Sequence, residues 1–176
     1  MTIWFTADTH FGHKNIMPYC GRDFASIEDH DKVLMDQINQ KVKQHDILYH
    51  LGDFAFGNLT QVVNYWTKIR CRRFNFIYGN HDINTVRNYL AGCSKKIINV
   101  NNKSIVMCHY AHVVWEKSNK KSWHLYGHSH GQLETTMDDN FPNRLSMDVG
   151  VDNVFQIFGE YRPISFEEIR AVFEKN

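Results

Sequence analysis

Short apolar runs alternate along the chain with longer segments whose apolar residues recur at helical spacing. The short runs are rich in β-branched and aromatic residues, and they predict strands at residues 2–7, 46–51, 73–78, 95–100, 104–108, 123–126, 133–136 and 145–152. The longer segments predict helices at residues 26–43, 58–69, 83–90 and 165–173. Strands that alternate with helices are typical of a layered α/β domain, so we expect a single domain over residues 1–176.

Cap residues mark three of the predicted helix starts. Ser26 precedes the first helix, and either Asn58 or Thr60 precedes the second. Ser165 and Glu168 have the spacing of a capping box before the last helix. These signals fix where the chain leaves a loop and enters a helix, and the spacing of apolar residues then indicates which helix face is buried.

Composition limits the classes of function. Lysine and arginine total 20 against 19 acidic residues, which gives a formal net charge of +1 and no global field for polyanions. Four cysteines are widely spaced without a CxxC pair, which argues against a zinc ribbon or a redox motif. The chain starts without a basic leader and contains no apolar run of about 18 residues, so we expect a soluble, cytoplasmic protein without a membrane partner.

Histidine is abundant, with 11 in 176 residues, and it gathers with aspartate, asparagine and glycine where predicted strands end. The ligand-type residues at these strand ends are Asp8, His10, Asp53, Asn80, His81, Asp82, His109, His128 and His130. The carboxyl ends of strands in an α/β sheet form a common edge, so these side chains can converge. Such an oxygen and nitrogen set without thiolates suits Mn²⁺ best, with Fe, Zn²⁺ or Ni²⁺ as alternatives, and it is large enough for two divalent ions that share a carboxylate.

The order of these motifs resembles that of the calcineurin-like metallophosphoesterases. The family signatures DxH, GD, GNH[DE], a lone H and GHxH correspond to residues 8–10, 52–53, 79–82, 109 and 127–130. The resemblance implies an α/β fold, a two-sheet β-sandwich flanked by helices, with a dinuclear metal site at the carboxyl ends of the strands.

The resemblance also implies a role for each site residue. One ion would be held by Asp8, His10, Asp53 and His130, and the second by Asp53, Asn80, His109 and His128. His81 would face the substrate as the catalytic histidine, and Asp82 would orient it. The expected reaction is hydrolysis of a phosphodiester or phosphomonoester by a hydroxide held between the ions, with His81 assisting as an acid.

The substrate is expected to be a small phosphate ester, such as a nucleotide. Phosphatases of the family that act on phosphoproteins carry an arginine shortly after GD and glutamate after GNH, whereas this chain has Phe54 and Asp82, which favours the phosphodiesterase-like branch. The segment at residues 11–15 also looks like that of small bacterial and phage members. A nuclease acting on short nucleic-acid ends and a non-catalytic metal-binding scaffold are the alternatives, and the small net charge disfavours extended nucleic acid.

Two polar segments could shape the substrate site. Candidate substrate contacts are His13, Asn15, Arg22 and Arg162, the first three of which lie in a predicted loop at residues 11–23. Residues 111–123 combine lysines with aromatic residues. That pattern fits either a flap over the site or an ordinary surface helix and loop.

Overall fold

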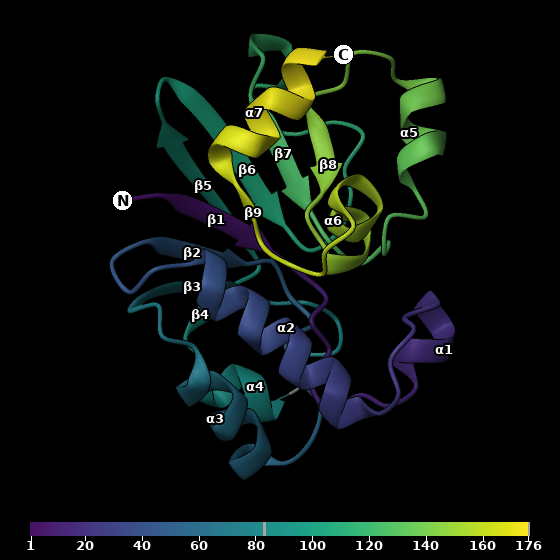
Figure 1. Cartoon of the computed structure of the whole chain (residues 1–176). Helices are drawn as coiled ribbons and strands as arrows, with labels where there is room; N and C mark the ends of the chain where they lie inside the picture. Colours follow the sequence, from purple (N-terminus) through teal and green to yellow (C-terminus); the bar gives the residue numbers. More distant parts are fainter. Residues whose placement is uncertain (83, 176) are drawn as a thin grey trace.

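The strands of the computed structural model form two sheets, and most of the strands end in runs of consecutive buried residues (Figure 1). The structure describes residues 1–82 and 84–175. The first sheet has the order β4-β3-β2-β1-β9, with β1 (Ile3–Thr6), β2 (Ile47–His50), β3 (Arg73–Ile77), β4 (Gly92–Cys93) and β9 (Ile164–Ser165). Strands β1 to β4 are parallel, and β9 is antiparallel to β1.

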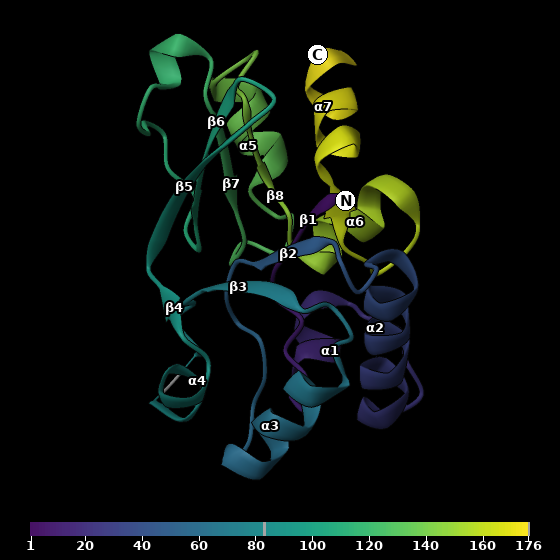
Figure 2. The ribbon, with the colours of Figure 1, turned by 90° about the vertical axis from the view of Figure 1, so that its left-hand side faces the viewer.

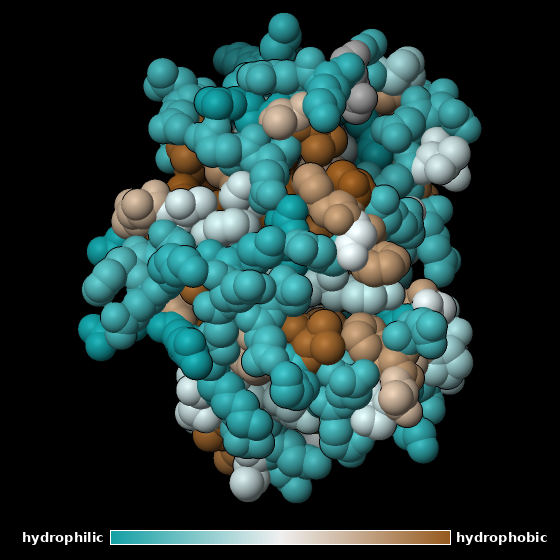
Figure 3. Space-filling view, in the orientation of Figure 1, coloured by the Kyte–Doolittle hydropathy of each residue, from teal (hydrophilic) through white to brown (hydrophobic). Residues whose placement is uncertain are grey.

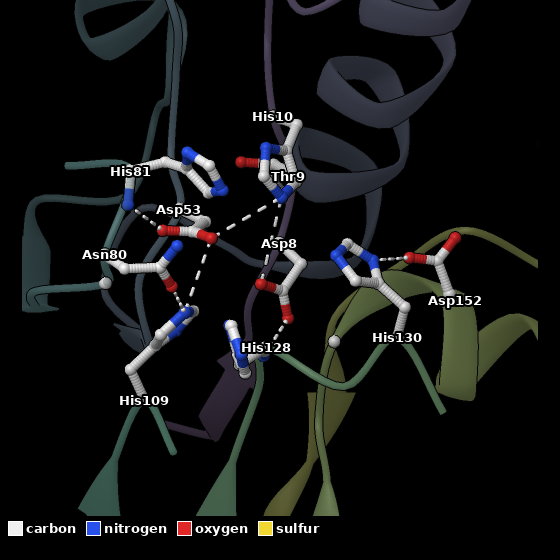
Figure 4. Close-up of polar contacts among 12 residues, drawn as sticks. Asp8, Thr9, His10, Asp53, Asn80, His81, His109, His128, His130 and Asp152 are labelled. Atoms are coloured by element: carbon white, nitrogen blue, oxygen red, sulfur yellow. Dashed lines mark hydrogen bonds and ion pairs between the residues drawn. The ribbon is translucent and has the colours of Figure 1, made fainter. Parts of the chain in front are cut away.

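The second sheet begins with an antiparallel pair and continues with parallel strands. Its order is β5-β6-β7-β8, with β5 (Lys95–Val100), β6 (Lys103–Cys108), β7 (Trp123–Tyr126) and β8 (Ser146–Asp148). Strands β5 and β6 form an antiparallel hairpin, and the strands predicted at residues 95–100 and 104–108 are confirmed. The parallel strands of both sheets present their carboxyl ends on the same side of the molecule, and this common edge carries the ligand-type residues (Figure 4).

Seven α-helices and a short 3₁₀ turn are seen in the described part of the chain. They are α1 (Ile16–Cys20), α2 (Ile27–Lys41), α3 (Leu59–Lys68), α4 (Asn84–Tyr89), η1 (Ser118–Lys120), α5 (Glu134–Asn140), α6 (Val151–Phe158) and α7 (Phe166–Lys175). Asn58 forms a capping box with Gln61, and Ser165 forms one with Glu168, so these predicted helix starts are confirmed. Within the described chain, no helix is both long and apolar enough to cross a bilayer.

Two apolar clusters hold the layers together. Phe5, Met107 and Leu125 belong to the cluster between the sheets, to which α7 also contributes buried side chains. The second cluster includes Leu34 of α2 and Val62 of α3, and these helices cover the face of the first sheet that is turned away from the second (Figure 2). On the face shown in Figure 3, apolar residues form separated groups among polar ones. The predicted two-sheet α/β fold flanked by helices is therefore confirmed.

Three local predictions are wrong. Residues 134–136 were expected in a strand but lie in α5, where Glu134 binds the buried Arg144 and ties the helix to the second sheet. The strand predicted at 145–152 ends at Asp148, whose carboxylate accepts the backbone N–H of Gly150 before α6 begins. The predicted loop at 11–23 contains α1. In the first two cases a polar side chain, which apolar periodicity does not register, forms the hydrogen bonds that accompany the change in local structure.

Candidate metal centre

The structure brings together every residue that was predicted to hold metal. Asp8 and His10 follow β1, Asp53 follows β2, Asn80 follows β3, His109 follows β6, and His128 and His130 follow β7. Their side chains point toward one another across the common edge of the two sheets (Figure 4). Residues separated by more than a hundred positions in sequence therefore surround one small region.

Asp53 lies at the middle of this region. Its Oδ2 is 3.6 Å from Nε2 of His10 and 3.4 Å from Nε2 of His109. Its Oδ1 accepts a hydrogen bond of 2.9 Å from the backbone N–H of His81. One carboxylate oxygen is thus fixed by the backbone, while the other faces imidazoles that follow two different strands and is placed to bind a cation.

A first group of ligand-type atoms is formed by Asp8, His10 and His130, which lie within 4.8 Å of one another. Asp8 Oδ2 accepts a hydrogen bond of 2.9 Å from the backbone N–H of His128. Asp8 Oδ1 and both ring nitrogens of His10 are buried and have no hydrogen-bond partner among the described residues. A buried polar atom left unpaired costs about 1–3 kcal/mol, so these atoms fit a bound cation.

A second group is formed by Asp53, His109 and His128, again within 4.8 Å. His109 Nδ1 donates to the carbonyl oxygen of Leu51 at 2.8 Å, which leaves Nε2 as the ligand atom of the neutral ring. That Nε2 lies 2.9 Å from Oδ1 of Asn80. An imidazole lone pair, an amide oxygen and a carboxylate that converge in this way form a donor set for a divalent ion.

The pKa values of the ligand-type residues show which of them carry a proton when no metal is bound. Burial is the main cause that raises the pKa of Asp8 to about 8, and burial lowers the pKa of His10 to about 2. Burial would also lower the pKa of His109, but its contacts with Asp53 and Asp8 outweigh that effect and raise the pKa to about 9. Asp8 and His109 therefore hold protons that metal binding must displace, whereas His10 is already neutral and free to bind a cation.

Five of the ligand-type residues have left-handed backbone conformations that non-glycine residues rarely adopt. The φ angles are 56° at Asp8, 48° at His10, 56° at Asp53, 68° at His128 and 50° at His130. Such conformations persist when surrounding contacts enforce them, and they concentrate at functional sites. Here they turn each chain sharply after its strand and direct the side chain into the shared region.

Two glycines make room for the carboxylates. A Cβ added at Gly79 would collide with Oδ1 of Asp53 and lie 2.6 Å from its backbone nitrogen. A Cβ added at Gly127 would lie 2.5 Å from Oδ2 of Asp8. The glycines of the GNHD and GHSH segments therefore permit the close approach of backbone to carboxylate.

Asp82 holds the loops and does not orient the ring of His81, which corrects the sequence-based assignment. Its buried carboxylate accepts backbone N–H groups of Asp53 at 2.8 Å, Phe54 at 3.0 Å and Gly79 at 2.7 Å. These bonds join the turns after β2 and β3. The exposed ring of His81 lies instead at the mouth of the site, with its centroid 5.7 Å from that of His10.

The two arginines that were predicted to contact the substrate, Arg22 and Arg162, are buried, so this prediction is wrong for both. Arg22 donates to both carboxylate oxygens of Asp152 at 2.7 Å and to the carbonyl oxygen of Asp8 at 2.7 Å, so it supports the turn after β1 from behind. Arg162 is buried against Glu168, with a hydrogen bond of 2.8 Å. Both guanidinium groups are engaged within the protein.

The other two candidate substrate contacts remain predictions. The half-buried ring of His13 stacks on Phe56 with a centroid separation of 3.9 Å, and it lies 6.5 Å from the ring of His81. Asn15 is exposed at the start of α1 and makes no side-chain cap bond there. His13 thus lines the mouth of the site beside His81, whereas Asn15 lies on the adjoining surface.

Sequence reasoning missed two aspartates that position the GHSH segment. Asp152 Oδ2 lies 2.6 Å from Nδ1 of His130, which directs the other ring nitrogen toward Asp8 (Figure 4). Asp148 accepts hydrogen bonds from the Ser129 hydroxyl at 2.7 Å and from the Gly131 N–H at 3.0 Å. Residues 145–152 resembled one apolar strand, so no local pattern separated these carboxylates from ordinary polar positions.

Comparisons with known proteins identify relatives of this chain and a solved structure with the same fold. The uncharacterized protein MJ1445 of Methanocaldococcus jannaschii is 29% identical over 174 residues, which cover 98% of this chain and 92% of that protein. The gene 66 protein of Mycobacterium phage L5 is 35% identical over 82 residues, covering 45% of this chain and 39% of that protein. The crystal structure of AQ665 from Aquifex aeolicus, a protein of unknown function, shares the fold, with a TM-score of 0.74 and 24% identity over 97% of this chain and 98% of that one.

The family profile covers every segment that contributes to the site. Residues 1–157 match the calcineurin-like phosphoesterase superfamily domain, a range that extends from β1 into α6 and includes all the ligand-type residues as well as Asp148 and Asp152. The chain belongs to the calcineurin-like phosphoesterase superfamily.

Proposed function

We propose that this protein hydrolyses small phosphate esters, nucleotide-like in chemistry, with the help of two divalent ions. Membership of the superfamily supports a metal-dependent phosphoesterase in general. The observation that carries the finer proposal is the position of Asp53 Oδ2, 3.6 Å from His10 Nε2 and 3.4 Å from His109 Nε2. A carboxylate oxygen between two imidazoles suits a centre in which two ions share one ligand.

The two groups of atoms described above supply the ligand sets. Asp8, His10 and His130 would hold one ion, and Asn80, His109 and His128 the other, with Asp53 shared between them. Mn²⁺ suits this mixture of carboxylate, amide and imidazole, and Fe, Zn²⁺ and Ni²⁺ are alternatives for the same donors. The buried unpaired atoms of Asp8 and His10 support the fit.

The residues around the ions have separate tasks in the reaction. Bound divalent ions would activate water and neutralise charge on the phosphoryl oxygens. His81, exposed at the mouth, would donate a proton to the leaving oxygen, an effect worth about 10² to 10⁴ in rate. The hydrogen bond from the His81 backbone N–H to Asp53 fixes the position of the backbone that carries the imidazole. Asp82 holds together the turns after β2 and β3.

The test is hydrolysis of p-nitrophenyl phosphate and bis(p-nitrophenyl) phosphate with and without Mn²⁺. Wild-type protein should show metal-dependent turnover on at least one of these esters, and Asp53→Asn should lose it because the shared carboxylate charge is removed. Asp36→Asn is the matched control, since Asp36 forms only an exposed pair with Lys32. Absence of turnover on both esters with any of the four metals would overturn the proposal and favour a non-catalytic scaffold.

A further inference from the structure

A cavity of about 470 Å³ adjoins one side of the metal centre. Asn80 and His109 line its inner end, and Arg87, Lys95 and Tyr110 line its other walls. Its described lining contains no Asp or Glu. The space next to the second ligand group therefore carries positive charge that no lining carboxylate neutralises.

Arg87 is held in place by backbone carbonyl oxygens, so no carboxylate neutralises its charge through these hydrogen bonds. Its Nε donates to the carbonyl oxygen of Asp82 at 2.7 Å, and Nη2 donates to that of Gly79 at 3.2 Å. The guanidinium also lies 5.1 Å from the centre of the Tyr78 ring. The side chain is exposed, and Nη1 takes no part in these contacts, so a preorganised donor is left for a ligand.

Lys95 and Tyr110 extend the same wall. Lys95 is exposed where β5 begins and forms no ion pair within the described chain. Tyr110 is 49% exposed, and its ring centre lies 4.6 Å from that of His128. A ligand in this cavity would thus meet two cations and an aromatic side chain within reach of the metal centre.

The opposite flank of the site has a different character. A shallower space of about 340 Å³ there is lined by His128, His130 and uncharged residues, without lysine or arginine. Of these two spaces, the one beside Arg87 is the one whose described lining carries lysine and arginine. Because one flank is cationic, an ester that carries a second anionic group would bind with that group toward Arg87.

We propose that the cavity of Arg87 and Lys95 binds a second phosphate of the substrate, so that the preferred substrates are esters of nucleoside bisphosphates. The inference rests on the proposed function, because it places the phosphate to be hydrolysed at the metal centre. Guanidinium and ammonium groups together match a dianionic phosphate. Arg87 and Lys95 are then specificity-determining residues.

Two chromogenic substrates that differ in one group test the proposal. Thymidine 5′-(p-nitrophenyl phosphate) and its 3′-phosphorylated form share the leaving group and the scissile ester. Wild-type protein with Mn²⁺ should prefer the 3′-phosphorylated form in kcat/KM by about tenfold or more, as expected for charge-assisted hydrogen bonds. Arg87→Met and Lys95→Met should each bring that ratio toward one, mainly through KM.

Controls separate recognition from structural damage. Arg87→Lys keeps the charge and should retain part of the preference, whereas Lys103→Met, at the far end of β6, should keep all of it. A purely structural role of Arg87 would reduce turnover of both substrates equally and leave their ratio unchanged. An unchanged ratio in both Met variants, or no preference in the wild type, would overturn the proposed subsite.

Equilibrium binding distinguishes failure of the subsite from failure of the catalytic proposal. Thymidine 3′,5′-bisphosphate and thymidine 5′-monophosphate are titrated into Mn²⁺-loaded wild type and Arg87→Met by calorimetry. If neither ester is hydrolysed but the bisphosphate still binds more tightly through Arg87, the proposed hydrolysis fails and the subsite stands. If hydrolysis occurs without any bisphosphate preference, the proposed function stands and the subsite fails.

Discussion

The ring of His130 is held by Asp152, with Nδ1 and Oδ2 separated by 2.6 Å. Asp152 is held in turn by two hydrogen bonds from Arg22. Burial would lower the pKa of His130, but the bond to Asp152 outweighs it and raises the pKa to about 11. The contact therefore keeps the Nδ1 proton directed at Asp152, so the other ring nitrogen is the one that a metal ion would take after it loses its proton.

Asp152→Asn should weaken metal binding by about 10- to 100-fold, because the amide holds the imidazole less firmly than the carboxylate does. Calorimetric titration with Mn²⁺ measures this change. Asp36→Asn, in an exposed pair, should bind metal as the wild type does. Unchanged Mn²⁺ affinity in Asp152→Asn would show that His130 is not oriented through this contact.

His81→Ala should reduce kcat by about 10² to 10⁴ if the ring acts as an acid. Metal affinity should change little, because the variant keeps the backbone N–H that binds Asp53. Turnover on p-nitrophenyl esters and Mn²⁺ titration report the two quantities separately. His45→Ala, an exposed histidine, serves as the control, and normal turnover of His81→Ala at saturating Mn²⁺ would exclude the acid role.

Gly79→Ala should damage metal binding more than its small change in volume suggests. The added methyl group would collide with the carboxylate of Asp53 and approach the backbone of the same residue, neither of which can move freely. We expect a loss of Mn²⁺ affinity together with a lower Tm, measured by calorimetry and thermal denaturation. Gly21→Ala is the control without a clash, since a Cβ there meets nothing within 4 Å; backbone strain at its φ of 65° can lower the Tm but should leave the Mn²⁺ affinity unchanged. A smaller effect at Gly79 than at Gly21 would contradict the steric argument.

Removal of metal should destabilise the fold, because it leaves Asp8 Oδ1 and the His10 ring nitrogens buried without partners. A ligand present at 100 times its Kd stabilises the native state by about 2.7 kcal/mol. The Tm after dialysis against a chelator should therefore rise on addition of Mn²⁺. The same addition should have a smaller effect on Asp53→Asn, and an equal rise in both proteins would indicate binding elsewhere.

The strand ends were predictable because parallel strands place their carboxyl termini at one edge. Asp8 and His109 could be assigned to the same site from sequence for that reason, although they follow strands of different sheets. The carboxylate of Asp82 was misassigned because the family resemblance implied that it orients His81. Its actual partners are backbone N–H groups, which carry no sequence signal.

Substrate contacts were the least predictable part of the site. Arg22 and Arg162 were chosen for charge near a motif or a turn, but burial and carboxylate partners engage both. Arg87 could not be selected in that way, since its position depends on how α4 returns toward the turn after β3. Which arginines face a cavity is decided by tertiary packing.

Glu168 provides a prediction of pH-dependent stability at a distance from the metal centre. Its carboxylate accepts hydrogen bonds from Arg162 at 2.8 Å and from the backbone N–H of Ser165 at 2.8 Å. Burial alone would raise its pKa, but these contacts outweigh burial and hold the pKa below the ordinary value. The native state therefore binds a proton less readily than the unfolded chain, whose glutamates titrate near about 4.3.

The sign of the effect follows from that difference. The stability contributed by the Glu168 charge is present above the unfolded-state pKa and is lost as the pH falls through the lower native pKa. Glu168→Gln can keep the capping box but loses the charge, so its free energy of unfolding should be lower than that of the wild type at pH 6. Below about pH 4 the two free energies of unfolding should approach each other. Urea unfolding of both proteins at pH 6 and pH 3.5, with chelator present, measures the difference. Glu167→Gln, in an exposed pair with Arg170, is the control, and a Glu168→Gln deficit that does not shrink in acid would show that its contribution is independent of charge.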